Sequence, residues 1–302
     1  MTRLAKIKEA MAKLEAEAAA TKAREKRERL EQAKAESDKA APAAKSKADA
    51  KCRNAQKEAP TAERRAEEKA RQVGRRPPDL TPRALTELPS HQVPADAKGK
   101  PTPKAQRNFT DPESCIMKQG TDYVQAYNCQ AGVDASSQVI VAQAVTNQPP
   151  DVEHLAPIVE QVEHLCGAVP VKLSADSGYF SQENAAYCHD KGLDAYIATG
   201  RAKHGEQVSS PCGRPAKNLD AKGRMRRKLL TKQGRTIYAR RKAVVEPVFG
   251  QIKQARGFRR FLLRGIEKVR AEWSLICTTH NLLKLFRHLI HLSRAIPLAA
   301  TA

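Results

Sequence analysis

The placement of the aromatic residues constrains this chain more than any other feature. Every Phe, Tyr and Trp lies at or after Phe109, and the first 108 residues contain none. Aromatic side chains contribute much of the apolar surface that a core buries. The break predicts a domain boundary at residue 108, a folded domain over residues 108–292 and a tail over residues 293–302.

The N-terminal part divides into a helical segment and a linker. Residues 1–40 are rich in Ala, Glu and Lys, which favour helices, and apolar residues from Leu4 to Leu14 give one short seam. This pattern predicts a helix, as one half of an antiparallel hairpin, and no long coiled coil. Residues 41–107 hold many Ala, Lys and Pro and bury little apolar surface. We expect them to be mostly disordered.

The second part alternates between strand and helix signals. Residues 123–134 and 138–146 predict a β-hairpin, and Asp151 is placed to cap the helix that follows. Further strands are expected over 169–176 and 193–199, and further helices over 181–192, 235–256 and 265–291, with an irregular basic stretch over 201–233. This order predicts an α/β domain in which helices flank a mixed sheet.

The charge of the chain is +21, and it is concentrated. Residues 201–260 carry 18 Lys and Arg against three acids, Glu206, Asp220 and Glu246. Such a block indicates an anionic partner, with nucleic acid first and a membrane surface second. No apolar run is long enough to span a membrane, and the seven cysteines show no CxxC pair. We therefore expect a cytoplasmic protein with reduced thiols.

Two acids stand where chemistry could occur. Asp176 ends an apolar strand and precedes a glycine turn, although it could equally form an Asx-turn or cap a helix. Glu246 lies in the basic helix, where an ion pair with Lys242 is the ordinary alternative. Taken together, the two carboxylates could hold Mg²⁺ or Mn²⁺, which prefer oxygen ligands. If so, they should approach one another in the folded chain.

Three stretches resemble DDE-type bacterial insertion-sequence transposases over residues 108–290. They read YARRKAVVEPVFGQIKQARGFRRFLLRG from Tyr238, LSADSGYFSQEN and DPESCIMKQGTDYVQAYNCQAGVD. The family signature has Tyr, Arg, Glu and Lys with two, three and six residues between them. Tyr238 and Arg241 match the first gap, and Glu246 and Lys253 match the last. Four residues separate Arg241 from Glu246, where the signature has three. The gap is three if Lys242 takes the place of the signature Arg.

The resemblance implies a ribonuclease H-like fold. It also implies that Asp176 and Glu246 are catalytic metal ligands, and that the partner is the double-stranded DNA of transposon ends. Tyr238, Arg241, Lys242 and Lys253, with Arg256 in the adjoining basic run, would contact this DNA. A nucleoid-associated location when bound to DNA would follow, and a homodimer stays open.

The family's first Asp, on a central strand, has no evident match. Asp111 stands in a turn-like stretch and Asp134 leads into the hairpin turn. The N-terminal helix resembles an insertion that follows the first-Asp strand in some of these transposases. The expectation is therefore a truncated transposase with an incomplete sheet, in which two strands have unpaired edges and cutting is lost.

Two alternatives remain beside the strand-cleaving enzyme. One is a DNA-binding remnant without catalysis. The other is a helical interaction protein that acts through residues 1–40. His280 is expected to be a packed or surface residue, and His288 and His291 have no third partner for a metal site.

Overall fold

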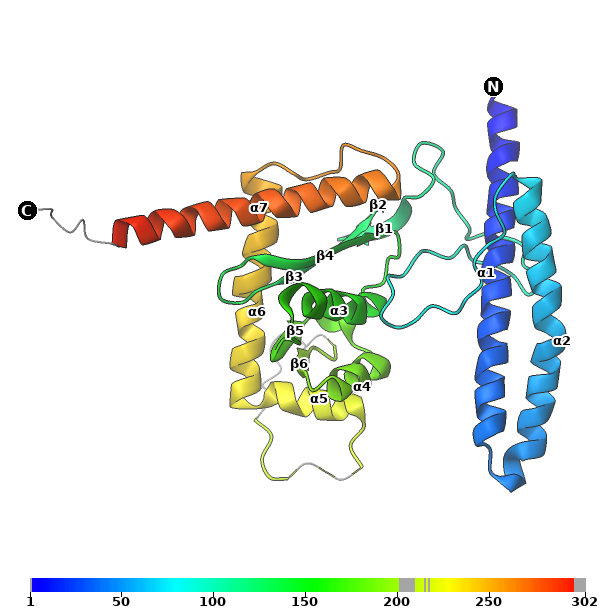
Figure 1. Ribbon diagram of the computed structural model, residues 1–302, viewed down its shortest axis with the longest axis horizontal. Helices are drawn as coiled ribbons and strands as arrows, with labels where there is room; N and C mark the ends of the chain where they lie inside the picture. Colours follow the sequence, from blue (N-terminus) through cyan, green and yellow to red (C-terminus); the bar gives the residue numbers. More distant parts are fainter. Residues whose placement is uncertain (1, 201–209, 215, 217, 296–302) are drawn as a thin grey trace, which may run out of the picture. The chain divides into compact units, whose positions relative to one another are not determined.

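The computed structural model describes residues 2–200, 210–214, 216 and 218–295, without the side chains of Ala43 and of residues 291–295. The chain divides into two compact units (Figure 1). The first comprises residues 1–84 and 90–115, and the second comprises residues 85–89 and 116–302. The first unit runs past the boundary expected at residue 108, and the domain limits taken from composition stay predictions.

The first unit is built on an antiparallel pair of helices, α1 (Arg3–Lys39) and α2 (Pro42–Gln72). Their contact is made of alanines, and Ala18, Ala23 and Ala66 are fully buried. Small side chains allow two helix backbones to approach closely. Ion pairs between the helices, such as Lys69 with Glu15 at 2.8 Å, lie beside the seam.

The expectation of a mostly disordered linker is wrong for residues 42–72, which form α2. Pro42 stands in the first turn, where its missing N–H costs nothing. Alanine contributes little apolar area per residue, but α1 supplies a partner for it over the whole helix. Beyond α2, residues 73–114 contain an isolated bridge between Ala95 and Pro101 and no other regular structure except turns.

The second unit begins with two hairpins. Strands β1 (Cys115–Gln119) and β2 (Asp122–Ala126) form one pair, which the sequence did not predict. Strands β3 (Asn128–Val133) and β4 (Ile140–Thr146) form the antiparallel hairpin that was predicted, with a register shift between Gly132 and Val133. The single β-rich run expected over residues 123–134 is thus divided at Tyr127 between two sheets.

Strand–helix alternation follows, as predicted. The short helix η1 (Val152–His154) leads into α3 (Leu155–Cys166), then β5 (Lys172–Ala175), η2 (Ser177–Tyr179), α4 (Gln182–Asp190) and β6 (Asp194–Ile197). Strands β5 and β6 are parallel, and Leu173 lies opposite Ala195. The described strands form three separate two-stranded sheets, so the single mixed sheet expected from the sequence is present only as its two kinds of pairing, antiparallel in β3–β4 and parallel in β5–β6.

Three long helices complete the unit. They are α5 (Ala221–Leu230), α6 (Lys232–Gly250), which continues as the π-helix η3 (Gln251–Ala255), and α7 (Ile266–Ala295). The expectation of an irregular stretch over residues 201–233 is wrong for residues 221–230, which form α5. Its N-cap residue, Asp220, accepts the N–H of Gly223 at 2.8 Å. Residues 201–209, 215 and 217 of that stretch, and 296–302 of the expected tail, lie outside the described residues.

Two hydrophobic clusters form the core of the second unit. The first joins β4 with α6, η3 and α7 through Val145, Val248, Ile252 and Trp273. The second joins α3 with β6 through Leu155, Val159 and Ile197. Helix α3 also packs on the β3–β4 hairpin, and α6 also packs on β5 and β6. Each of these helices therefore contacts both strand pairs.

Candidate functional site

Asp176 lies directly after β5, at the carboxyl end of a strand in a parallel pair. It is half-buried, and its Oδ1 accepts the N–H of Gly178 at 3.0 Å. The Asx-turn considered as the alternative role is therefore present. Oδ2 accepts no hydrogen bond from the described residues, so one carboxylate oxygen stays available to a ligand.

A second carboxylate, that of Asp151, lies beside Asp176. A Cβ placed on Gly178 would be 3.2 Å from Oδ2 of Asp151 and 3.2 Å from Oδ1 of Asp176. Asp151 stands at an N-cap position, as predicted, at the start of η1, but its side chain accepts no capping backbone N–H. Its Oδ1 instead accepts Nδ2 of Asn128 at 2.8 Å and Nε2 of Gln130 at 2.9 Å.

The amide of Gln130 joins Asp151 to η2, the turn that follows β5. Gln130 is 3% exposed, and its Oε1 accepts the hydroxyl of Tyr179, which follows Asp176. Burial raises the pKa of the Tyr179 phenol, and the charges of Asp151 and Asp176 raise it further, so the hydroxyl stays a donor. The network fixes the chain on both sides of the two carboxylates.

These partners were not predicted from the sequence. Asn128 and Gln130 stand two residues apart in β3, and therefore on one face of the strand. A buried amide on an otherwise apolar strand is a signal that could have indicated a polar partner. Nothing in the residues near Asp151 pointed to Asp176 as its neighbour.

Arg241 faces the protein interior on α6. Its Nε is buried without a hydrogen-bond partner among the described residues, and its guanidinium lies 5.6 Å from the ring centroid of Tyr238. Its charge also lowers the pKa of Tyr179, against the larger effect of burial. The first two members of the predicted signature are therefore half-buried neighbours.

Glu246 lies on the exposed face of α6. Val244 and Val248 are buried, and Glu246 is roughly 160° around the helix from each of them, at 3.6 residues per turn. Lys242 and Lys253 are exposed too, with the Lys253 ammonium 5.6 Å from the Phe249 ring centroid. The described contacts join Glu246 neither to Asp176 nor to Lys242, and a shared ion between the two predicted acids stays a prediction.

Arg256 is bound by the protein itself. Its guanidinium donates to the carbonyl of Ile276 at 3.2 Å and to the hydroxyl of Thr279, both on α7. It also stacks on Phe258, with 4.9 Å between the guanidinium carbon and the ring centroid. These contacts tie the end of η3 to α7.

The remaining candidates have structural partners. Asp134 stabilises the β3–β4 turn, where hydrogen bonds from Ser136 and Ser137 lower its pKa to about 2. His280 is buried, as expected of a packed residue, and its Nε2 lies 3.1 Å from the carbonyl oxygen of Gln138. His288 is exposed, and the side chain of His291 lies outside the described residues.

Asp151 and Asp176 offer the oxygen donors that Mg²⁺ prefers. However, Oδ1 of Asp151 already accepts two amide hydrogen bonds. Across the described part of the chain, no group of three or more His, Cys, Asp or Glu is arranged to hold a metal ion. The donors fit Mg²⁺ or Mn²⁺ in kind but not in number.

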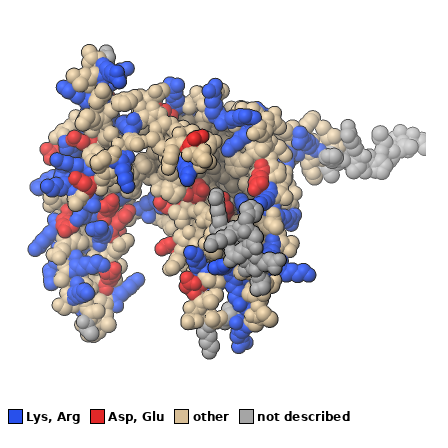
Figure 2. All heavy atoms as spheres, turned by 180° about the vertical axis from the view of Figure 1, so that it is seen from behind, with Lys and Arg blue, Asp and Glu red and all other residues tan. Residues whose placement is uncertain are grey.

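Charge is distributed differently in the two units. Lys and Arg are intermixed with Asp and Glu along the helical hairpin (Figure 2). In contrast, residues 221–256 carry twelve Lys and Arg and a single acid, Glu246. None of the described helices has the length and apolarity needed to cross a membrane.

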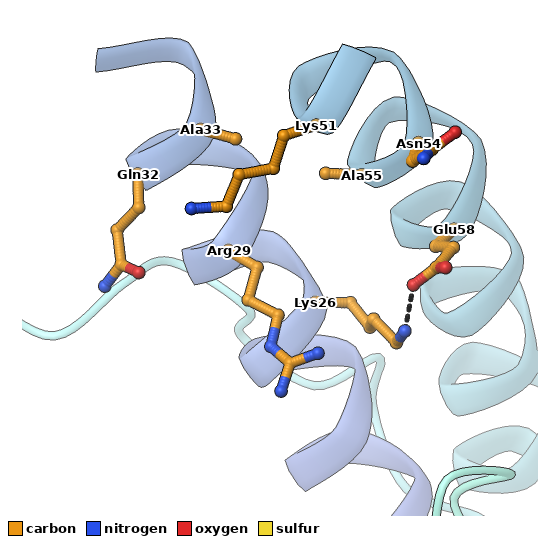
Figure 3. A pocket seen from close by; sticks show the side chains of 8 residues that line it. All are labelled: Lys26, Arg29, Gln32, Ala33, Lys51, Asn54, Ala55 and Glu58. Atoms are coloured by element: carbon orange, nitrogen blue, oxygen red, sulfur yellow. Dashed lines mark hydrogen bonds and ion pairs between the residues drawn. The ribbon is translucent and has the colours of Figure 1, made fainter. Parts of the chain in front are cut away.

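A pocket of about 340 Å³ opens between α1 and α2 (Figure 3). Short side chains, Ala33 and Ala55, leave space there, and Lys26 and Glu58 pair across it. Lys51, also at its rim, is paired with Glu36 at 2.7 Å. The pocket contains none of the predicted site residues.

Comparison with known protein families gives a match. The family model described as "Transposase DDE domain" matches residues 89–282, which is more than half of the chain. The matched region contains β3–β6, Asp151, Asp176 and the whole basic signature on α6. No curated protein and no solved structure matches the chain.

Proposed function

The chain belongs to the transposase DDE-domain family, and from this premise we propose that it acts on the DNA of transposon ends. The reaction class would be strand cleavage and strand transfer. The observation that carries the proposal is the position of Asp176, at the carboxyl end of a parallel strand inside the matched region. In open α/β sheets, ligands bind at the carboxyl ends of strands.

The finer fold assignment is also a proposal. An antiparallel hairpin, β3–β4, is followed by α3 and then by a parallel pair, β5–β6. This is the order of pairing in the outer parts of a ribonuclease H-like sheet. The proposal is supported by α3 and α6, each of which contacts both strand pairs, as helices do when they cover the two faces of one sheet.

The roles of the side chains follow from their positions. Asp176 and Glu246 would be the catalytic carboxylates. Lys242 and Lys253, which are exposed on α6, would hold phosphates of the DNA backbone. Tyr238 and Arg241 would position the end of η2 and the bound strand, since both lie on the half-buried side of α6.

A second candidate is favoured by a specific observation. Asp176 and Glu246 do not meet in the described contacts, and no third acid joins them on a strand. Phosphoryl transfer depends on positioning and charge stabilisation, so two acids that do not share an ion would not support it. The chain would then bind DNA without cutting it. The helical interaction protein stays a prediction that these observations do not test.

One experiment separates the candidates. The full chain is mixed with a labelled DNA duplex that carries the transposon ends, in the presence of Mg²⁺ or of EDTA. Both DNA binding and DNA cleavage are measured. Asp176→Asn is compared with Asp190→Asn, an exposed acid at the end of α4. Duplex binding without product supports the binding remnant. Cleavage that Asp176→Asn abolishes and Asp190→Asn spares supports the enzyme, and absence of DNA binding overturns both.

A further inference from the structure

The loop over residues 256–265 is both basic and apolar, and it contains no acid. It reads RGFRRFLLRG, with four arginines and four large apolar side chains. It has no helix or strand of its own and leads from the end of η3 to the start of α7 (Figure 1). Surface loops are usually polar. The positions of these apolar side chains therefore decide what the loop can bind.

Both ends of the loop are fixed to α7. The guanidinium of its first residue is bound there, as described above. Near its other end, Phe261 packs edge-on against Trp273, with 6.5 Å between the ring centroids. The Glu272 carboxylate accepts the N–H of Leu262 at 2.9 Å and that of Leu263 at 3.0 Å. The backbone of the loop is thus held in place before any partner binds.

This fixed backbone leaves two leucines in solvent. Leu262 is 77% exposed and Leu263 is 47% exposed, whereas Phe261 is partly buried against the first hydrophobic cluster. Both leucine N–H groups are bound to Glu272, so turning the leucines inward would break these bonds. A single exposed leucine is ordinary, but adjacent exposed apolar residues with a charged rim indicate an interaction site.

Two unpaired arginines flank the more exposed leucine. Arg260 and Arg264 are exposed, and in the described part of the chain no hydrogen bond or ion pair reaches either guanidinium. Arg259, in contrast, donates to the side chain of Gln254. Leu262 therefore stands two residues from a free cation on each side. The guanidinium group suits phosphate, and an apolar tip suits the stacked bases between two phosphate backbones.

We propose that Leu262 is a wedge that enters the minor groove of duplex DNA and opens one base step, while Arg260 and Arg264 bind phosphates on either side. Apolar side chains that enter the minor groove in this way unstack a base step and kink the duplex by about 20–90°. Unstacking costs free energy, which the added phosphate contacts offset. Because the loop is already fixed to α7, little ordering of the protein is needed on binding.

The charge around the loop favours DNA over a membrane surface. The loop follows directly on η3, where Lys253 is exposed, so its arginines extend the basic run of α6 and η3. Segments that lie on membranes present a broad apolar face along an amphipathic helix. This loop presents two leucines on an irregular backbone instead. The role of Leu262 rests on the proposed function, because it needs duplex DNA as the partner.

Fluorescence of a modified duplex tests the wedge on the full chain. The probe is a duplex with the transposon ends in which 2-aminopurine replaces one adenine at a time, and a terminal dye reports binding by anisotropy. Unstacking raises 2-aminopurine fluorescence. The parent should raise it at least threefold at one position, Leu262→Ala should abolish the rise, and Leu262→Phe should retain it. The control, Leu275→Ala, removes a leucine that is 64% exposed on α7 and should match the parent.

The wedge and the proposed function fail in different ways. Equal fluorescence with the parent and Leu262→Ala, or no rise at any position, would overturn the wedge while anisotropy still showed DNA binding. Absence of binding by the parent would overturn both. Arg260→Ala and Arg264→Ala should each reduce the slope of log K against log salt by about 1.

Vesicles of phosphatidylserine and phosphatidylcholine test the other surface. Leu262→Ala should bind them no differently from the parent, and its circular dichroism should match that of the parent because the side chain is exposed. If the variant loses vesicle binding and keeps the fluorescence rise on DNA, the loop serves a membrane surface and the wedge is overturned.

Discussion

The carboxylates of Asp151 and Asp176 lie against one glycine. An added Cβ on Gly178 would be 3.2 Å from an oxygen of each. Residues 25 positions apart are thereby held together at the end of β5, where Gln130 and Tyr179 fix the two turns. Asp176 is the catalytic acid of our proposal, and its contact with Gly178 can be tested without knowledge of the DNA sequence.

Gly178→Ala should disturb this pair. The methyl group would be closer to two carboxylate oxygens than most Cβ contacts are, so these carboxylates would have to move by a few tenths of an ångström. We expect the free energy of unfolding to fall by about 1–3 kcal/mol, measured in urea. Gly250→Ala is the control, because a Cβ there meets nothing within 4 Å in the middle of a helical segment. This control should be neutral or stabilising by up to about 1 kcal/mol.

Gln130→Leu should lower the free energy of unfolding, although the Gln and Leu side chains are similar in size. The change removes the partner of the Tyr179 hydroxyl and one donor to Asp151, which leaves buried polar groups unsatisfied. A loss of about 1–3 kcal/mol in the free energy of unfolding is expected. Gln182→Leu, at an exposed position in α4, should change stability by less than about 0.5 kcal/mol. Equal effects of the two variants would contradict the network.

Stability should fall in mild acid because of His154. This side chain is fully buried beside Thr146, and burial lowers its pKa. The unfolded state, with a His pKa of about 6.5, therefore binds the proton more readily than the folded state. Stability is complete above this value and is lost as the pH falls from about 6.5 toward the lowered folded pKa.

Melting temperatures between pH 5 and pH 8 measure this dependence. His154→Gln should flatten the curve, and His280→Gln should flatten it in the same direction, since burial also lowers the pKa of His280. His189 has a side chain that is 90% exposed, so His189→Gln should leave the curve unchanged. A parent protein with no loss of stability down to pH 5 would rule out the buried histidines as its acid-sensitive groups.

DNA binding should depend steeply on salt. Each phosphate neutralised by Lys or Arg releases counterions, so affinity falls as salt rises. Lys242→Ala and Lys253→Ala should each reduce the slope of log K against log salt by about 1. Lys6→Ala, an exposed residue of α1, is the matched control. Arg256→Ala should reduce stability instead, because its guanidinium is bound to α7.

The helical hairpin should not tolerate a larger side chain in its seam. Ala23 is fully buried between α1 and α2, and Ala23→Leu would force the helices apart. A decrease of about 1–3 kcal/mol in stability is expected from urea unfolding followed by circular dichroism. Ala35→Leu, at an exposed position in the same helix, makes the same change in helix propensity but does not overpack the contact between the helices. It should alter stability by less than about 0.5 kcal/mol.

Local patterns predicted most elements of the second unit. The β3–β4 hairpin, α3, β5, α4, β6, α6 and α7 were all expected within a few residues, since each is encoded by periodicity over a short window. Helix α2 was missed because its stability depends on a partner rather than on its own apolar content. Helix α5 was missed because a basic, Gly-containing sequence gave no apolar period.

The sequence by itself determined the family, the alternation of strands and helices, and the acids that stand in recognisable motifs, Asp176 and Glu246. These features are local, because motif spacing and side-chain period are read along the chain. The tertiary structure decided which residues meet. It placed Asp151 beside Asp176, turned Glu246 to the exposed face of α6 and bound Arg256 to α7. Contacts between residues far apart depend on how helices and strands pack, and no short window of sequence contains that information.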